Sequence, residues 1–392
     1  MIKFEEAYNI IMDSAFHTGS EEIPFMESSG RILLSPVRSD TDLPPFDSSA
    51  VDGFACRQDD LGKELIVTGS VAAGAEPEIT VEPGTCVRIM TGAAMPAGAD
   101  YVFMLEESQQ ISADTVKFTG KSGSHNIEKR GGDALTGDLL IRPGCRIRPQ
   151  EIAIMAMAGC TMINAGKKVK AGVITTGNEL IEPDKKPALF QIRNSNAWQL
   201  LSQVERAGGT GKYFGTAADS ISSVRQLLDA ALSESDIVII TGGISAGDYD
   251  FVPAALAETE LMLRFDSVAV QPGRPMKFWT GNRKIVFGLP GRPVSTFVQF
   301  ELLVKPLMAK MMGAAFPPAD NMNMILGTDY SRKKADLMAW VPVKTDRNGE
   351  VVPVEFHGSG HSGSLHEATG LMAVPLGQSW IQKGETVSVR AI

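Results

Sequence analysis

The ten residues at 241–250, Thr-Gly-Gly-Ile-Ser-Ala-Gly-Asp-Tyr-Asp, combine the residue types that bind phosphate with an unexpected pair of acids. The possible donors are the backbone at Gly242, Gly243 and Gly247 and the hydroxyls of Thr241 and Ser245. Glycines let backbone amides approach an anion closely, and such a loop ahead of a helix favours negative charge. The pattern therefore predicts a phosphate site.

The two carboxylates of the same loop, Asp248 and Asp250, would repel a phosphate. A Mg²⁺ ion removes this conflict because it can bridge carboxylates to phosphate oxygens. The alternative is that both residues cap the helix that follows, which is a common use of aspartate. The loop by itself leaves both interpretations open.

Three neighbouring segments offer further candidates for an anion or metal site. Glu179 ends the loop 175–179, Arg292 lies in the segment 288–296, and Arg274 and Lys277 follow residue 270. Glu179 is either a ligand or a first-turn charge that complements a helix dipole. The cationic side chains could bind an anion or lie in solvated turns.

These loops follow strands in a region that alternates between strand and helix patterns. Apolar strands are expected at 169–175, 235–241 and 284–288, and helices at 197–206, 224–232 and 297–310. Alternation of this kind predicts a parallel α/β sheet. Ligands bind at the carboxyl ends of the strands in such sheets, so the polar loops should lie at one edge.

The flanking regions have different patterns. Residues 51–132 contain short strands separated by Gly, Pro and Asp, which predicts a β-rich insertion. Helices are expected within the first 16 residues and at 149–159, and we expect them to pack together as one discontinuous domain. After a linker near 312–318, further strands predict a small β-barrel or sandwich.

Composition narrows the class of protein. The 392 residues are 43% hydrophobic and carry a net charge of −9, which argues against a broad surface for nucleic acid or anionic membranes. The cysteines show no CxxC pairing, so neither a zinc site nor a disulfide framework is expected. No signal peptide or apolar span of about 18 residues is present, so we expect a cytoplasmic protein.

With these loops identified, the sequence resembles the molybdopterin molybdenumtransferase (MoeA) family, whose eukaryotic relative is the gephyrin E domain. The resemblance covers nearly the whole chain and rests on the order and spacing of several motifs. They are Pro-Phe-Asp-Ser-Ser-Ala-Val-Asp-Gly-Phe-Ala at 45–55, the segment 88–98, Arg-Gly-Gly-Asp at 130–133, Thr-Gly-Asn-Glu-Leu at 176–180, the loop 242–250 and Gly-Leu-Pro-Gly-Arg-Pro-Val-Ser at 288–295.

The resemblance implies a multidomain α/β plus β fold. A discontinuous helical domain, residues 1–50 and 133–167, would carry the β-rich insertion 51–132. A central molybdopterin-binding-type parallel α/β domain, 168–313, would precede a C-terminal β-barrel-like domain, 318–392. It also implies a homodimer whose cleft is shared between subunits, which gives Asp52, Thr91 and Asp133 a role at the cleft; their turn-prone sequences alone indicate ordinary turns.

The implied reaction inserts molybdate into adenylylated molybdopterin, with hydrolysis of the pyrophosphate bond and release of AMP. By motif match, Glu179, Asp219 and Asp250 would bind Mg²⁺ and activate water, while Asp219 could instead cap the helix from Ser222. The implied substrate-binding residues are Thr176, Gly242, Gly243, Ser245, Gly247, Arg274, Lys277, Pro290, Arg292, Ser295, Arg332, Ser359 and Ser362.

Two departures from the family pattern alter its cationic positions. Family members often have Lys-Pro-Gly-Lys-Pro where this chain has Gln271-Pro-Gly-Arg-Pro, so the role of the first lysine would be vacant or pass to Arg274 or Lys277. Arg292 replaces a frequent asparagine and adds a cation suited to molybdate. The nearby histidines, His357, His361 and His366, are expected in a flexible loop without a metal.

Two other functions fit parts of the sequence. A molybdopterin adenylyltransferase shares the α/β domain and its glycine loop, but it needs only that domain. A non-catalytic scaffold like gephyrin would leave the acidic loop residues dispensable. The resemblance to the molybdenumtransferase family also allows other proteins of molybdenum cofactor biosynthesis as partners.

Overall fold

The structure is a computed structural model, and it describes residues 1–121, 123–244, 250–315 and 321–392. The chain forms two compact units, one made of Met1–Ser35, Pro143–Arg148 and Met162–Ile392, the other of Pro36–Arg142 and Pro149–Thr161. We call them the α/β unit and the insertion unit. In the part of the chain described, no helix is both long and apolar enough to cross a membrane.

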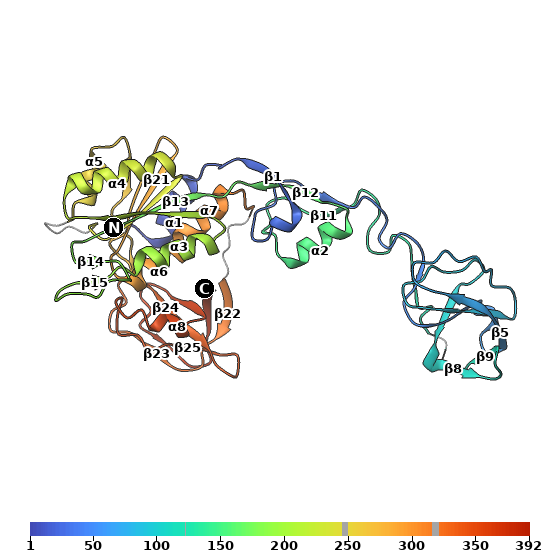
Figure 1. The fold of residues 1–392 in the computed structure, drawn as a ribbon. Helices are drawn as coiled ribbons and strands as arrows, with labels where there is room; N and C mark the ends of the chain where they lie inside the picture. The colour runs from blue at the N-terminus through green and yellow to red at the C-terminus, as the bar shows by residue number, and fades with distance from the viewer. Residues whose placement is uncertain (122, 245–249, 316–320) are drawn as a thin grey trace. The chain divides into compact units, whose positions relative to one another are not determined.

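The centre of the α/β unit is a six-stranded sheet, two strands of which, β13 and β21, are labelled in Figure 1. The strand order is β16-β13-β17-β21-β20-β18. Its strands are β13 (Lys170–Thr176), β16 (Thr210–Ala217), β17 (Ile237–Thr241), β18 (Met262–Phe265), β20 (Lys277–Gly281) and β21 (Lys284–Leu289). The first four in the order are parallel and the last two pairings are antiparallel. The predicted parallel α/β sheet is therefore confirmed, with an added antiparallel edge.

Helices cover both faces of this sheet, which explains why the strand β17 is buried at every position and apolar from Ile237 to Ile240. The helices are α3 (Asn196–Arg206), α4 (Ile221–Glu234), α5 (Val252–Ala257), α6 (Pro293–Gln299) and α7 (Lys305–Met311), with a π-helical turn at Phe300–Val304 between the last two. Within β17, Ile237 and Ile239 pack with α3, α6 and α7, whereas Val238 and Ile240 pack with α4 and α5. The side chains alternate between two cores.

The expected pairing of the two flanking helices is wrong. Helix α1 (Phe4–Asp13) packs on α7, and the ring centroid of Phe4 lies 5.7 Å from that of Trp340. Helix α2 (Pro149–Met157) belongs to the insertion unit, where it contacts β11 (Leu139–Ile141). The apolar face of α1 was visible in the sequence, but its partner lies about 300 residues away along the chain.

The insertion unit contains the predicted short strands. They form a six-stranded sheet of β7 (Tyr101–Met104), β4 (Gly53–Cys56), β6 (Thr85–Ile89), β5 (Glu64–Val71), β9 (Thr115–Phe118) and β8 (Ser108–Gln110), in that order. Short pairs join β2 (Val37–Arg38) to β11 and β3 (Ser48–Ser49) to β10 (Ile127–Glu128). Cys56 and Cys86, both buried, are free thiols.

The C-terminal strands form a second sheet within the α/β unit. Its order is β19 (Val270–Gln271), β24 (Met338–Thr345), β26 (Gly370–Val374), β28 (Thr386–Ala391) and β22 (Asn321–Ile325), with β25 (Val351–Pro353) also on β24. A parallel bridge between Leu326, just after β22, and Val351 closes the ring of pairings. This closure accounts for the barrel-like character expected from the sequence. The finer division into four domains remains a prediction.

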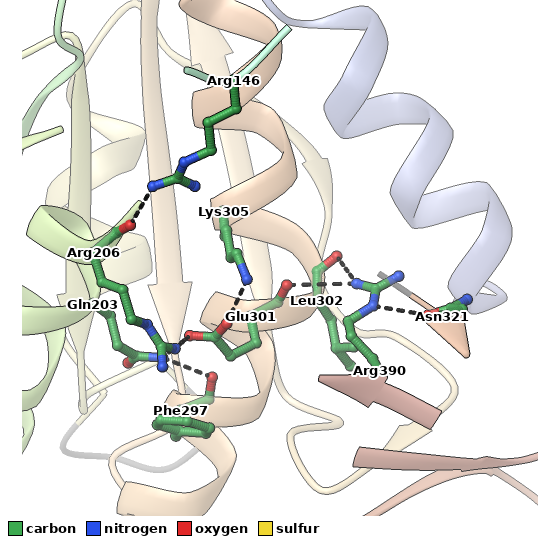
Figure 2. Close-up of polar contacts among 9 residues, drawn as sticks. All are labelled: Arg146, Gln203, Arg206, Phe297, Glu301, Leu302, Lys305, Asn321 and Arg390. Atoms are coloured by element: carbon green, nitrogen blue, oxygen red, sulfur yellow. Dashed lines mark hydrogen bonds and ion pairs between the residues drawn. The ribbon is translucent and has the colours of Figure 1, made fainter. Parts of the chain in front are cut away.

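A buried polar cluster joins these C-terminal strands to the helical layer at the π-helical turn (Figure 2). Glu301, only 1% exposed, accepts a hydrogen bond from Gln203 at 2.7 Å and pairs with Arg206 and with Lys305, the latter at 3.3 Å. Arg390 of β28 donates to the carbonyl oxygen of Leu302 at 3.2 Å. The side chains thus supply partners for buried charge and for backbone at the turn.

Candidate functional site

A pocket of about 840 Å³ lies at the carboxyl ends of β13, β16, β17 and β21. We call it the carboxyl-edge pocket. Its walls come from the loops after those four strands, from residues 270–275, and from Leu337, Phe356, Gly358 and Ser359 of the C-terminal part. All of these residues belong to the α/β unit. The position agrees with the expectation that ligands bind beyond the carboxyl ends of parallel strands.

The structure brings Glu179, Asp219 and Asp250 to this one pocket. The helix-dipole alternative for Glu179 is wrong, because the residue precedes a short strand, β14 (Leu180–Ile181), that pairs with β15 (Ile192–Arg193). The capping alternative for Asp219 is also wrong, because Ser220 is the N-cap of α4 and accepts a hydrogen bond from the Ser223 amide at 3.2 Å. Neither carboxylate is needed to start a helix.

Asp250 likewise does not occupy the cap position of the helix that follows it. The N-cap of α5 is Phe251, which makes no side-chain cap hydrogen bond. Ser245, Gly247 and Asp248 lie outside the described residues. The residues of the loop 241–250 that line the pocket are therefore Thr241, Gly242, Gly243, Ile244 and Asp250.

The three carboxylates do not converge on a single point. Among the residues with a described placement, no group of three or more His, Cys, Asp or Glu side chains is close enough to hold a metal ion. Mg²⁺ usually needs only one or two carboxylates because substrate phosphates and water complete its octahedral shell. The donor set fits an ion shared with a phosphate ligand, and does not form an all-protein cage.

Gly242 and Gly243 are required by the shape of the loop. Both have positive φ, 90° and 60°, and a Cβ at either position would lie 2.7 or 2.8 Å from Oγ1 of Thr176. A side chain there would force apart the loops after β13 and β17. Close packing of these loops is thus a sufficient reason for both glycines, independent of any ligand.

Cationic groups line the pocket beside the carboxylates. Arg193, Arg274 and Arg292 all contribute to its wall, and Arg292 stands at the N-cap position of α6. The loop that carries Arg274 is held by Gln299, whose buried side chain donates to the Pro272 carbonyl oxygen at 2.9 Å. Arginine guanidinium groups suit phosphate and other oxyanions because they donate bidentate hydrogen bonds.

Two asparagines that sequence reasoning missed position the loops of this site. Nδ2 of Asn196 donates to the carbonyl oxygen of Gly291 at 2.8 Å and to Oγ1 of Thr241 at 3.1 Å. Nδ2 of Asn194 donates to Oγ1 of Thr175 at 3.1 Å and to the hydroxyl of Tyr213. The cluster Asn-Ser-Asn just before a predicted helix was the available signal, since such residues favour helix starts.

The remaining predicted binding residues divide into two groups. Thr176, Pro290, Ser295 and Ser359 line the carboxyl-edge pocket, whereas Lys277, Ser362 and Arg332 do not. Arg332 instead donates to the carbonyl oxygens of Leu337, Pro375 and Gln378, each at 2.7 Å. Its guanidinium therefore holds together three backbone segments of the C-terminal part. One of them contains Leu337, which lines the pocket.

The insertion unit holds the predicted residues Asp52, Thr91 and Asp133. The backbone amide and hydroxyl of Thr91 donate to Oδ1 of Asp52 at 2.7 and 2.9 Å. These hydrogen bonds, led by the one from the amide, lower the pKa of Asp52 below its usual value. Asp133 is exposed, and its amide donates to the Leu43 carbonyl oxygen.

Three protein-family models match successive parts of the chain. Residues 2–159 match the MoeA N-terminal region (domain I and II), 172–310 a probable molybdopterin binding domain, and 325–392 the MoeA C-terminal region (domain IV). A molybdopterin molybdenumtransferase of Staphylococcus epidermidis is 32% identical over 399 residues, covering 99% of this chain and 95% of the relative. One from Bacillus subtilis is 31% identical, covering 95% and 90%.

Solved structures agree with this result. The crystal structure of the molybdopterin biosynthesis moeA protein from Pyrococcus horikoshii OT3 matches with a TM-score of 0.83 and 29% identity, with all of both chains covered. Fold and sequence thus define a transferase of molybdenum cofactor biosynthesis. The chain belongs to the molybdopterin molybdenumtransferase family, the MoeA proteins.

Proposed function

We propose that this chain inserts molybdate into adenylylated molybdopterin in the cytoplasm, with hydrolysis of the pyrophosphate bond and release of AMP. The observation that carries the proposal is the meeting of Glu179, Asp219 and Asp250 with arginines in one pocket at the carboxyl edge of the sheet. Oxyanion substrates need cationic donors, and hydrolysis needs a carboxylate that can orient water.

The arginines would bind the charged parts of the substrates. Arg274 and Arg292 line the pocket from two separate loops, so together they can hold a pyrophosphate or a molybdate between them. Family members often have a lysine where this chain has Gln271, and we assign the role of that lysine to Arg274. Arg274 lines the pocket, whereas Lys277 does not. Gln299 keeps that loop in place through Pro272.

The carboxylates would divide between orienting water and holding Mg²⁺. One or two of Glu179, Asp219 and Asp250 would bind the ion together with phosphate oxygens, where it would neutralise charge on the phosphoryl group. A carboxylate left free of the ion can accept a proton from the attacking water. Each role requires the side chain to be ionised and to face the pocket.

The proposal includes a homodimer. Asp52, Thr91 and Asp133 are ordered on the insertion unit by hydrogen bonds within that unit. By the resemblance to MoeA proteins, the insertion unit of a second copy would complete the cleft with these residues. The four-domain division expected from the sequence belongs to the same proposal, with α1 reassigned to the α/β core.

The test is incubation of the purified protein with adenylylated molybdopterin, MgCl₂ and molybdate, with AMP followed by chromatography. We expect molybdate-dependent AMP release without consumption of ATP, and loss of release when EDTA replaces MgCl₂. An adenylyltransferase would instead consume ATP, and a scaffold would release no AMP. Either of those results would overturn the proposal.

A further inference from the structure

A second cavity, of about 860 Å³, lies at the opposite edge of the central sheet from the carboxyl-edge pocket. It is lined by residues at or just before the amino ends of the parallel strands, including Lys170 of β13, Thr210 of β16, Asp236 and Lys284 of β21. We call it the amino-edge cavity. No residue lines both hollows, and a strand the length of β13 separates them by about 20 Å.

The amino-edge cavity is strongly cationic in an otherwise acidic chain. Its six cationic side chains are Arg31, Lys167, Lys168, Lys170, Lys212 and Lys284, and its three carboxylates are Glu21, Glu234 and Asp236. The excess of three positive charges contrasts with the net charge of −9 for the whole chain. Such a concentration of one sign in a hollow raises the local potential for counter-ions.

The carboxylates of the cavity are already engaged. Glu234 pairs with Lys212, and Glu21 pairs with Arg31. Asp236 accepts a hydrogen bond from the backbone amide of Lys170 at 2.8 Å. Each of the three carboxylates of the cavity therefore already has a partner within the chain.

Four lysines of the cavity form no ion pair with a described carboxylate, and one of them, Lys284, donates from Nζ to the carbonyl oxygen of Ser235 at 2.8 Å. Lys167, Lys168 and Lys170 are exposed and form no ion pair with any residue whose position is described. They come from one short segment, which brings them into the same hollow and makes their charges repel one another. An anion bound among them would relieve this repulsion.

We propose that the amino-edge cavity binds a nucleotide-sized ligand through a diphosphate or triphosphate group. Lysine ammonium groups are compact point charges that bind phosphate oxygens well, and three local excess charges match the charge of such a group. The volume falls in the range of small-molecule sites and exceeds the need of a single inorganic anion. The site is separate from the proposed catalytic pocket and does not depend on the proposed reaction.

Isothermal titration of the full chain at low salt tests the proposal with three probes: ADP, inorganic triphosphate and adenosine. We expect both phosphate probes to bind, with affinity falling as KCl is raised, and adenosine not to bind. If triphosphate binds and ADP does not, the site recognises inorganic polyphosphate and the proposal of a nucleotide ligand is wrong. Binding of both supports a nucleotide ligand, whereas equal binding of adenosine and ADP, or no binding of either phosphate probe, overturns the proposal.

A matched pair of variants assigns the signal to this cavity. Lys167→Gln/Lys168→Gln should weaken binding by about tenfold or more, because two charge-assisted contacts are removed. Lys333→Gln/Lys334→Gln removes the same charge from adjacent exposed lysines elsewhere and should retain the wild-type Kd. An equal loss in both variants would overturn the proposal.

The carboxyl-edge pocket could also bind ADP, so the titration is repeated with Arg292→Ala. Arg292→Ala should still bind ADP at the amino-edge cavity. Adding Lys167→Gln/Lys168→Gln to this variant should weaken ADP binding as much as it does in the wild type. If binding is lost with Arg292→Ala and kept with the lysine pair, the ligand belongs to the other pocket and the proposal is wrong. Far-UV circular dichroism checks that each variant is folded.

Discussion

The side-chain amide of Asn196 donates a hydrogen bond to the carbonyl oxygen of Gly291 at 2.8 Å and thereby ties the first turn of α3 to the loop after β21. The same amide also donates to Thr241 at the end of β17. Asn196 is buried and lines the carboxyl-edge pocket, and its Oδ1 has no partner among the described residues. One side chain thus sets the spacing of two loops of the proposed site.

Replacing Asn196 with aspartate should destabilise the chain and slow AMP release. The substitution would place an oxygen against the Gly291 carbonyl oxygen and remove both donated bonds, at a cost of about 1–3 kcal/mol. Urea unfolding and the AMP assay measure the two effects. Asn323→Asp, at an exposed position of β22, is the control and should change stability by less than about 0.5 kcal/mol. Equal stability of the two variants would contradict this role of Asn196.

Neutralising the pocket carboxylates should abolish turnover and leave the fold intact. Asp250→Asn and Glu179→Gln are expected to reduce AMP release by about 100-fold or more, since the reaction would lose a proton acceptor or a metal ligand. The melting temperature should stay close to that of the wild type. Glu205→Gln, at an exposed position on α3, should keep full activity. Wild-type turnover in Asp250→Asn would remove that residue from the mechanism.

Glu301→Gln should lower the free energy of unfolding by about 3 kcal/mol, because it removes a buried carboxylate from Lys305, whose side chain is only 16% exposed (Figure 2). The second cation of the cluster, Arg206, is 48% exposed and contributes less to this cost. Glu367→Gln breaks a pair with Lys344 in which both side chains are about half exposed. The cost there should be at most about 1 kcal/mol, since exposed pairs contribute little. Denaturant unfolding compares the two variants, and similar costs would mean that burial does not decide the energy of the Glu301 cluster.

Asp42 should make the stability of the insertion unit dependent on acid pH. Hydrogen bonds from the Thr136 amide, Arg130 and the Thr136 hydroxyl lower its pKa to about 2 from 3.8. Because the folded pKa is the lower one, the stabilisation is present above pH 3.8 and is lost as pH falls toward 2.

Unfolding by denaturant at several pH values tests this dependence. The difference in free energy of unfolding between the wild type and Asp42→Asn should be constant from pH 7 to about pH 5, and it should shrink as the pH approaches 2. Asp59→Asn, at a side chain that is 85% exposed, should show no comparable change. A difference at pH 2 as large as at pH 7 would contradict the assigned pKa.

The strands and the edge at which the site lies could be predicted from local pattern. The apolar run that becomes β17 and the polar loop after it reflect burial on both faces followed by emergence at the sheet edge. Glu179 and Arg292 could be placed at that edge for the same reason. The sequence could not show whether Asp219 and Asp250 cap the helices that follow them, because a helix start is uncertain by one or two residues. In the structure the N-cap residues are Ser220 and Phe251.

The sequence by itself determined the alternation of strands and helices, the family, and the set of polar loops at the carboxyl edge. Only the tertiary structure decided which helix α1 packs against, that Asn196 joins two loops, and that lysines gather at the amino edge. The physical reason is the distance along the chain between the residues in contact. Periodicity reports which face of an element is buried, whereas these contacts join residues whose separation along the chain leaves no mark on local pattern.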